Sequence, residues 1–418
     1  MKLHFTGEIG GYLETDVLTS MGTFFLWMVI ELKRKIMLKI PNLRIFLALS
    51  FIAVITIYPV LALPVMIGIL MDHADMSSFS AGWLTSFGTL ATASAGLLMS
   101  IKMDNKNLQR ISRFGLIIAV AIDLLSAFTA GATIMFFFIR VIWGIGMGVT
   151  HVASIASIAH YDNYKHGYGI YVGLQFIVSG IALYIVPVYS DLMGVTGFFI
   201  GFAILDFFAL FLTKFLSSEY NQPAKESKTK SSLGVIITVP AILAIVGFAL
   251  FEAANTSQFS YIERFGVISN FTEHQIGLAL LVGSLLGILG ALSIFVIGDK
   301  FDLVKPLTFG FLLSMSALTM LLLSNDYTIF FITSCLLGFS WSFCMPFIDS
   351  LLAKIDRKGR VVAAGSSISF FGSALGPGMA AMVVSGDQYR NSFVLAICLF
   401  LVTLLIFVIL GKKMKEAL

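Results

Sequence analysis

Long apolar runs separated by short basic clusters constrain this chain more than any other feature. Segments such as Ile45–Leu70, Leu233–Leu250 and Phe393–Leu410 contain almost no ionisable side chain, and the chain is 58% hydrophobic but only 12% charged. About 20 apolar residues, each rising 1.5 Å along a helix, cross the hydrocarbon core of a bilayer. Because lipid offers no hydrogen-bond partners to the backbone, each run is expected to be a helix. The sequence therefore predicts an all-α polytopic membrane protein.

Twelve spans are predicted when apolar runs are counted between charged residues and Gly, Pro or Asn. Their limits are 43–71, 79–101, 114–131, 133–157, 167–188, 197–216, 233–259, 274–297, 305–324, 327–352, 361–384 and 392–411.

The segment that precedes these spans has a different character. Val17–Leu32 is apolar but short, contains Glu31 and is followed by a basic cluster at 33–35, so we expect an interfacial helix rather than a thirteenth span. The order of apolar and basic residues is the reverse of a signal peptide. Met37 is an alternative translation start, because the residues from Met37 to Arg44 resemble a short cytoplasmic lead-in.

The distribution of basic residues predicts the orientation of the spans. If Asn42 lies on the cytoplasmic side, all but three of the 27 Lys and Arg residues fall on that side. The exceptions are Arg264 and Arg390, which are expected in outer loops, and Arg140, which lies within a span. This asymmetry follows the positive-inside rule and predicts that both termini are cytoplasmic.

The two halves of the chain repeat one another. A shift of 195 residues places Ser77 on Thr272 and Gly88 on Gly283, and a shift of 194 places Gly144 on Gly338. Ser77 and Thr272 are candidate helix N-caps, and the glycines permit close contact between helices. We expect an extension at 1–41, a six-helix bundle at 42–216, a cytoplasmic linker at 217–232, a second bundle at 233–411 and a tail at 412–418.

Two six-helix halves joined by a long loop are typical of secondary transporters, and residues from about 42 to 411 resemble the major facilitator superfamily. The strongest local match is Arg140-Val-Ile-Trp-Gly144-Ile-Gly146, which is similar to the Arg-x-x-x-Gly-x-Gly pattern of the fourth span in that family. The resemblance implies twelve helices in two bundles related by a pseudo-twofold axis. The loop signature after the second span keeps its acid and bases here but loses its glycines.

The same resemblance points to loops that close the cytoplasmic side. These are the loop after the second span, its copy in the second half, and the loop after the tenth span. The candidate gate residues are Asp104, Lys106, Arg110, Asp299, Lys300, Asp356 and Arg360.

Arg140 is the first candidate for the transport site. A guanidinium within a bilayer is costly, so Arg140 is expected to face the bundle interior and meet an acid, a carbonyl or an anionic solute. Asp123 could pair with it or carry a proton. His151 shares the helical stripe of Arg140 and is a candidate for proton coupling. Bracing of helices by Arg140 and a neutral, hydrogen-bonded His151 are the alternatives.

Further candidates lie on other spans. Glu252 and Asn255 belong to a run too polar to face lipid, which predicts an irregular helix end along the outer half of the path. Gln175 is expected on a cavity wall, and Tyr58 and Trp341 are candidate aromatic walls. Each of these side chains could instead serve helix packing.

These features together predict a secondary transporter, coupled to protons, that moves a small organic solute, with a leaning towards carboxylates because of Arg140. The alternative is a proton-driven multidrug or metabolite efflux antiporter that uses Glu252 or Asp123. No phosphate-binding loop, metal-ligand cluster or nucleophile–base pair is apparent, so we expect no ATPase, enzyme, cofactor, metal or nucleic-acid partner. The expected state is a monomer in the plasma (bacterial inner) membrane.

Overall fold

The computed structural model describes residues 42–102, 107–131, 133–161, 164–216, 238–294, 302–356 and 360–416. Every regular element in these ranges is helical. The expected interfacial helix at 17–32, the alternative start at Met37 and the linker at 217–232 lie outside the described residues.

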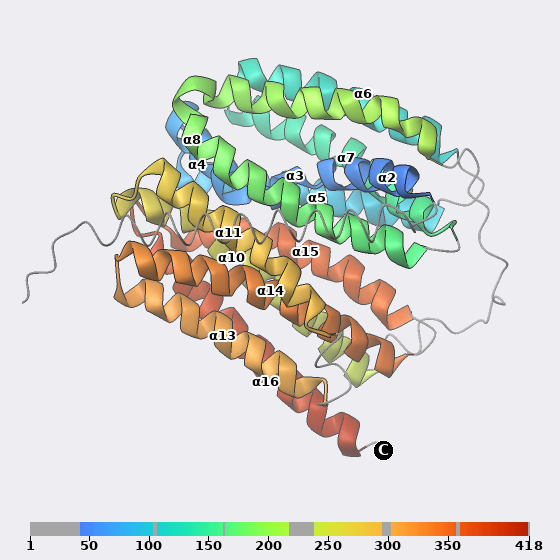
Figure 1. Ribbon diagram of the computed structural model, residues 1–418, viewed down its shortest axis with the longest axis vertical. Coiled ribbons are helices and arrows are strands. Elements are labelled where there is room, and N and C mark those ends of the chain that lie inside the picture. Colours follow the sequence, from blue (N-terminus) through green and yellow to red (C-terminus); the bar gives the residue numbers. More distant parts are fainter. Residues whose placement is uncertain are drawn as a thin grey trace, which may run out of the picture.

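The helices form two bundles that lie side by side (Figure 1). The first bundle contains α2 (Leu43–Ile55), α3 (Tyr58–Leu61), α4 (Leu63–His73), α5 (Ser78–Lys102), α6 (Leu108–Thr129), α7 (Thr133–Ile158) and α8 (Tyr164–Leu212), followed by the 3-10 turn Thr213–Phe215. The second contains α10 (Val239–Ile268), α11 (Glu273–Leu292), α13 (Val304–Leu323), α14 (Tyr327–Ile355), α15 (Arg360–Val383) and α16 (Arg390–Glu416).

Each predicted span corresponds to helix in the structure, with differences at the boundaries. Eight helices of the described ranges are long and apolar enough to cross a membrane, with the fifth and sixth spans counted together. These two spans are joined in α8 and separated only at Gly194, whose φ of 53° and ψ of −169° are not helical. The gap predicted at 189–196 is therefore a single-residue break, because glycine alone adopts that conformation at low cost.

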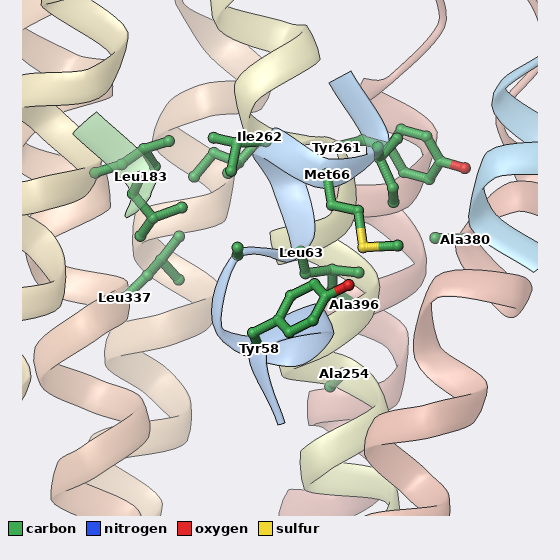
Figure 2. Close-up of a cluster of buried hydrophobic side chains, with 14 of the residues drawn as sticks. Tyr58, Leu63, Met66, Leu183, Ala254, Tyr261, Ile262, Leu337, Ala380 and Ala396 are labelled. Atoms are coloured by element: carbon green, nitrogen blue, oxygen red, sulfur yellow. The ribbon is translucent and has the colours of Figure 1, made fainter. Parts of the chain in front are cut away.

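The first predicted span is interrupted. Between 43 and 73 the chain forms α2, α3 and α4, with non-helical backbone at Ile57 and Ala62. Pro59 and Pro64 lie just after these breaks, and a proline neither donates a backbone hydrogen bond nor accommodates the carbonyl of the preceding turn. Figure 2 shows this broken segment winding through the core with Tyr58, Leu63 and Met66 on it. The first span is therefore three short helices in sequence and not one continuous helix.

The seventh span differs from expectation at its polar run. An irregular helix end was predicted around Glu252, but α10 continues as a regular helix to Ile268. Polar side chains of the run bond to carbonyls of their own helix: Asn255 Nδ2 donates to Phe251 O at 2.8 Å and Thr256 Oγ1 to Glu252 O at 2.9 Å. Arg264, predicted in an outer loop, consequently lies in the last turns of α10.

The internal repeat is visible in how helices cross within each bundle. A Cβ added to Gly144 on α7 would meet the carbonyl oxygen of Gly88 on α5, and a Cβ added to Gly338 on α14 would meet that of Gly283 on α11. The predicted N-caps also recur, since Ser77 Oγ accepts from Ser80 N at 3.1 Å and Thr272 Oγ1 from Gln275 N at 3.2 Å. The same helix crossing is therefore built twice.

Candidate functional site

A cavity of about 130 Å³ lies between the two bundles. From the first bundle it is lined by the end of α3 and by α8, and from the second by α10, α11 and α14. The predicted site residues Gln175, Glu252, Asn255 and Trp341 all line it. The sequence therefore identified a group of side chains that the fold brings together from both halves.

Glu252 is the acid of this cavity, and its carboxylate is held by two donors. Trp341 Nε1 on α14 donates to Oε1 at 3.0 Å, and Ser373 Oγ on α15 donates to Oε2 at 2.6 Å. The Glu252 side chain is only 6% exposed, so these bonds replace most of its hydration. The indole of Trp341 also packs edge-on against Phe176 of the first bundle, with ring centroids 5.8 Å apart.

Amide and hydroxyl groups surround this acid. Gln175, Asn255 and Gln258 line the cavity together with Ser179, Ser284 and Ser334. Gln258 is 4% exposed, and its Oε1 has no hydrogen-bond partner among the described residues. A buried amide oxygen without a donor costs free energy, so this atom is suited to accept from a bound molecule.

Tyr58, Asp123 and Arg140 do not line the cavity but form a separate buried cluster. Arg140 Nη1 forms an ion pair with Asp123 Oδ1, and Arg140 Nη2 donates to Tyr58 Oη at 2.8 Å. Tyr58 Oη in turn donates to Asp123 Oδ1 at 3.1 Å. Arg140 therefore faces the bundle interior and meets an acid, which was one of the expected partners, but it does not reach the cavity where an anionic solute would bind. The nearby carboxylate and the hydroxyl of the interrupted first span hold the guanidinium inside the first bundle.

Aromatic rings complete this cluster. The Arg140 guanidinium lies 4.4 Å from the ring centroid of Trp143 and 5.1 Å from that of Phe199. Trp143 Nε1 donates to Asp123 Oδ2 at 3.1 Å, so both carboxylate oxygens of Asp123 are hydrogen-bonded. Arg140 is 2% exposed and Asp123 is fully buried. Tyr58 is 1% exposed and therefore is not the aromatic cavity wall that the sequence suggested.

His151 lies between the two bundles, away from the cavity lining. Its Nδ1 is 2.9 Å from Thr56 Oγ1 and 3.1 Å from Ala53 O, both of which belong to the first span. The carbonyl can only accept, so this geometry requires a proton on Nδ1. The imidazole stacks on Phe370 of α15 with centroids 6.2 Å apart. The arrangement matches the alternative of a hydrogen-bonded histidine that packs between helices.

Few of the predicted gate residues can be placed. Asp104, Lys106, Asp299 and Lys300 lie outside the described residues. Arg110 is exposed in the first turn of α6, and its backbone N–H donates to Asn107 Oδ1 at 2.8 Å. Asp356 is 7% exposed at the end of α14. Arg360 begins α15, where only its backbone is described.

The bundles meet at one end of the molecule, which holds residues 74–77 and 269–272 and is here called the turn end. The opposite end, which holds residues 42, 216, 238 and 416, is called the linker end. At the turn end, Tyr261 Oη donates to Ser78 O at 2.7 Å and Gly378 N donates to Ser86 Oγ at 2.7 Å. Both hydrogen bonds join the first bundle to the second.

An ion-pair network, not foreseen from the sequence, also closes the turn end. Arg264 Nη1 on α10 pairs with Asp72 Oδ1 on α4 at 2.6 Å. The same guanidinium binds Glu263 in a two-pronged arrangement, with Nε–Oε2 at 2.6 Å and Nη2–Oε1 at 2.7 Å. From the sequence, Arg264 is expected in an outer loop, and that position does not predict an ion pair with Asp72 or Glu263. In the structure Arg264 lies near the end of α10, where its guanidinium reaches both carboxylates.

Comparison with known proteins agrees with this architecture. The crystal structure of the nucleoside transporter NupG, in a point-mutant form, superposes with a TM-score of 0.72 over 88% of this chain and 99% of that chain, at 12% sequence identity. At that identity the similarity shows the fold alone. A search of curated proteins finds no match. The family model of the Major Facilitator Superfamily matches residues 45–298 and 265–417. The chain therefore belongs to the major facilitator superfamily and is a multi-pass membrane transporter.

Proposed function

We propose that this protein is a secondary transporter for a small polar solute that is neutral or positively charged and carries several hydrogen-bond donors. The solute binds in the cavity between the bundles and is released on the other side of the membrane when they rock. The observation that carries the proposal is the charge of the cavity. Glu252 contributes a carboxylate, and no Lys, Arg or His occurs among the described residues that line it.

The leaning towards a carboxylate solute depended on Arg140, and the position of Arg140 removes that support. An anionic solute in this cavity would lie near Glu252 without a cation to balance either charge. Like charges repel strongly where water is scarce, because the effective dielectric constant is low. A neutral or cationic solute avoids this repulsion, and a cation is also attracted by the Glu252 carboxylate.

The uncharged groups of the cavity narrow the solute class further. Gln175, Asn255 and Gln258 offer amide oxygens, and the unpartnered oxygen of Gln258 favours a solute with N–H or O–H groups. Phe176 and Trp341 offer aromatic faces from opposite bundles. Nucleosides, the substrates named for NupG, are neutral, flat and rich in donors, and so belong to this class.

Coupling to a proton gradient is part of the proposal. The sequence contains no phosphate-binding loop, and its spans bury acids at Asp123, Asp206 and Glu252. By the distribution of basic residues the linker end faces the cytoplasm of a plasma (bacterial inner) membrane. Both the cavity and the buried cluster are formed within one chain, which supports a functional monomer.

Efflux of cationic drugs or metabolites by exchange with protons is the second candidate. Glu252 supports it, since a single carboxylate beside aromatic rings is suited to an organic cation. The two candidates share the binding site, and the second requires exchange of the solute for protons. Solute movement driven by an imposed pH gradient of either polarity in liposomes tests for that exchange.

The experiment that tests the proposal is binding and counterflow of three probes in proteoliposomes: uridine as a neutral donor-rich solute, ethanolamine as a cation and lactate as an anion. Uridine or ethanolamine is expected to be carried, and Glu252→Gln is expected to weaken binding by about 10- to 100-fold, the range for a hydrogen bond to a charged group. Glu273→Gln, which changes an exposed acid on neighbouring α11, is the control. Transport of lactate alone, or a Glu252→Gln protein that binds like wild type, contradicts the proposal.

A further inference from the structure

Asp206 is a buried acid that none of the contacts described so far uses. It lies on the second half of α8, after the break at Gly194, and its side chain is fully buried. Neither of its carboxyl oxygens has a hydrogen-bond partner among the residues that the structure describes. An ionised carboxylate without donors is one of the most costly groups to place in a membrane.

The charged neighbours of Asp206 belong to the buried cluster. Asp123, Arg140 and Tyr58 interact electrostatically with its carboxyl group, and Trp143 belongs to the same cluster. Arg140 already forms an ion pair with Asp123, and the indole N–H of Trp143 is directed at Asp123 Oδ2. The single guanidinium therefore balances one carboxylate, and a second negative charge on Asp206 would have no counterion.

A proton resolves this arrangement. Two ionised carboxylates repel each other and can only accept hydrogen bonds, whereas a protonated carboxyl group carries no charge. Asp123 accepts from three donors and is the partner of the cation, so Asp123 is the ionised member. Asp206, which lacks donors, is the member that holds the proton.

We propose that Asp206 carries a proton while the neighbouring Asp123 stays ionised, and that this carboxyl pair is a proton-binding site outside the solute cavity. With the proton bound, the cluster of Asp206, Asp123 and Arg140 has no net charge. When the proton leaves to water, two carboxylates face one guanidinium. The cluster is then stable only if the bundle rearranges and admits water.

The interrupted first span connects this site to the cavity. Val60 and Leu61, at the end of α3, line the cavity, while Tyr58, at its start, bonds to both Arg140 and Asp123. Ser179 on α8 also donates to Leu61 O at 2.7 Å. Because α3 is a four-residue helix between two breaks, a change at Tyr58 is transmitted to the cavity wall over a short distance. This coupling rests on the proposed function, whereas the proton on Asp206 does not.

Infrared spectroscopy of the purified, lipid-reconstituted protein tests the proton directly. At neutral pH we expect a carboxylic-acid carbonyl band in the wild-type protein that shifts in D₂O and is missing in Asp206→Asn. Asp349→Asn, which changes a partly buried acid on α14 far from the cluster, serves as the control and should keep the band. A wild-type protein without a band specific to Asp206 at neutral pH overturns the proposal.

A second measurement tests the coupling without a solute. Spin labels at positions 75 and 387, both exposed at the turn end on opposite bundles, report the distance between the halves after the native cysteines are replaced. In the wild-type protein we expect the distance distribution to change as pH rises and the site loses its proton. Asp206→Asn should lose this response, although Asp72, Glu263 and Tyr389 at the turn end remain.

The outcomes separate the two proposals. An unchanged pH response in Asp206→Asn overturns the coupling even if the infrared band is present. Glu252→Gln should weaken solute binding but keep the Asp206 band. A Glu252→Gln protein that keeps both therefore contradicts the proposed function and leaves the proton site standing. Because Asn is nearly isosteric with Asp, Asp206→Asn is expected to fold. Asp206→Glu is a second variant, and we expect it to show a protonated-acid band at a shifted frequency.

Discussion

Trp341 donates its indole N–H to Glu252 across the second bundle, from α14 to α10, at 3.0 Å. The same tryptophan contacts Phe176 of the first bundle, so one side chain both orients the cavity acid and touches the opposite half. In the proposed function, a solute that binds Glu252 therefore acts on a side chain that contacts both bundles.

Replacing Trp341 by Phe tests this relationship. The ring contact is largely kept, but Glu252 loses a donor, at a cost of about 1.5–3 kcal/mol for a hydrogen bond to a charged group. We expect weaker solute binding, measured by counterflow, and a stability lowered by about that amount, measured by thermal unfolding. Trp83→Phe is the matched control, since the Trp83 indole N–H has no partner among the described residues. Equal effects of the two variants on binding would remove the role assigned to Trp341.

The ion pair between Asp72 and Arg264 is expected to favour closure of the turn end. Asp72→Asn removes the charge on a side chain that is 49% exposed, so solvent screening limits the effect to about 0.2–1 kcal/mol, or at most about a fivefold change in the open population. The distance between spin labels at 75 and 387 measures it. Asn325→Ala, which removes a 2.6 Å contact to Arg390 within the second bundle, should leave the distance unchanged.

The helix crossings at Gly144 and Gly338 predict that both bundles are destabilised to a similar degree by a larger side chain at these positions. Gly144→Val and Gly338→Val each place a branched side chain against a backbone carbonyl of the facing helix, and we expect each to lower stability by about 1–3 kcal/mol or more. Gly201→Val, at a position with no atom within 4 Å of an added Cβ, is the control. Thermal unfolding in detergent is the measurement, and tolerance of either core substitution would contradict the close crossing.

Gly194 is expected to be sensitive for a different reason. An added Cβ there meets no atom within 4 Å, but the residue has a φ of 53° with an extended ψ. Gly194→Ala should therefore cost about 1–3 kcal/mol through backbone strain alone. Gly201→Ala, in regular helix on the same element, separates this strain from the loss of glycine as such. If Gly194→Ala and Gly201→Ala unfold at the same temperature, the break in α8 does not depend on the positive φ of Gly194.

The sequence predicts the periodic parts of this fold well, because a bilayer allows few alternatives to a helix. The apolar runs, the repeat at Gly144 and Gly338, and the N-caps at Ser77 and Thr272 are all local patterns. The breaks beside Pro59 and at Gly194 are harder to predict, because membrane helices often tolerate proline and glycine when neighbours satisfy the backbone.

The site shows the limit of reasoning from single helices. The sequence singles out Glu252, Asn255, Gln175 and Trp341. Side chains with polar groups are costly to expose to lipid, so their presence in a span indicates a contact inside the protein. The direction in which Arg140 points depends on which helix supplies a carboxylate, and no spacing along α7 contains that information. Asp206 and Gln258 stand out only once their surroundings are known, since it is the lack of a partner that distinguishes them.

The proposed proton on Asp206, which makes the buried cluster neutral, bears on how membrane voltage acts on this transporter. Moving one elementary charge through the full field changes the free energy by about 2.3 kcal/mol per 100 mV. A first bundle in which Arg140 is balanced by Asp123 can rock without displacing net charge as long as Asp206 is protonated. Electrical work then comes from the solute and from each coupled proton, so the sign of the transport current should follow their summed charge.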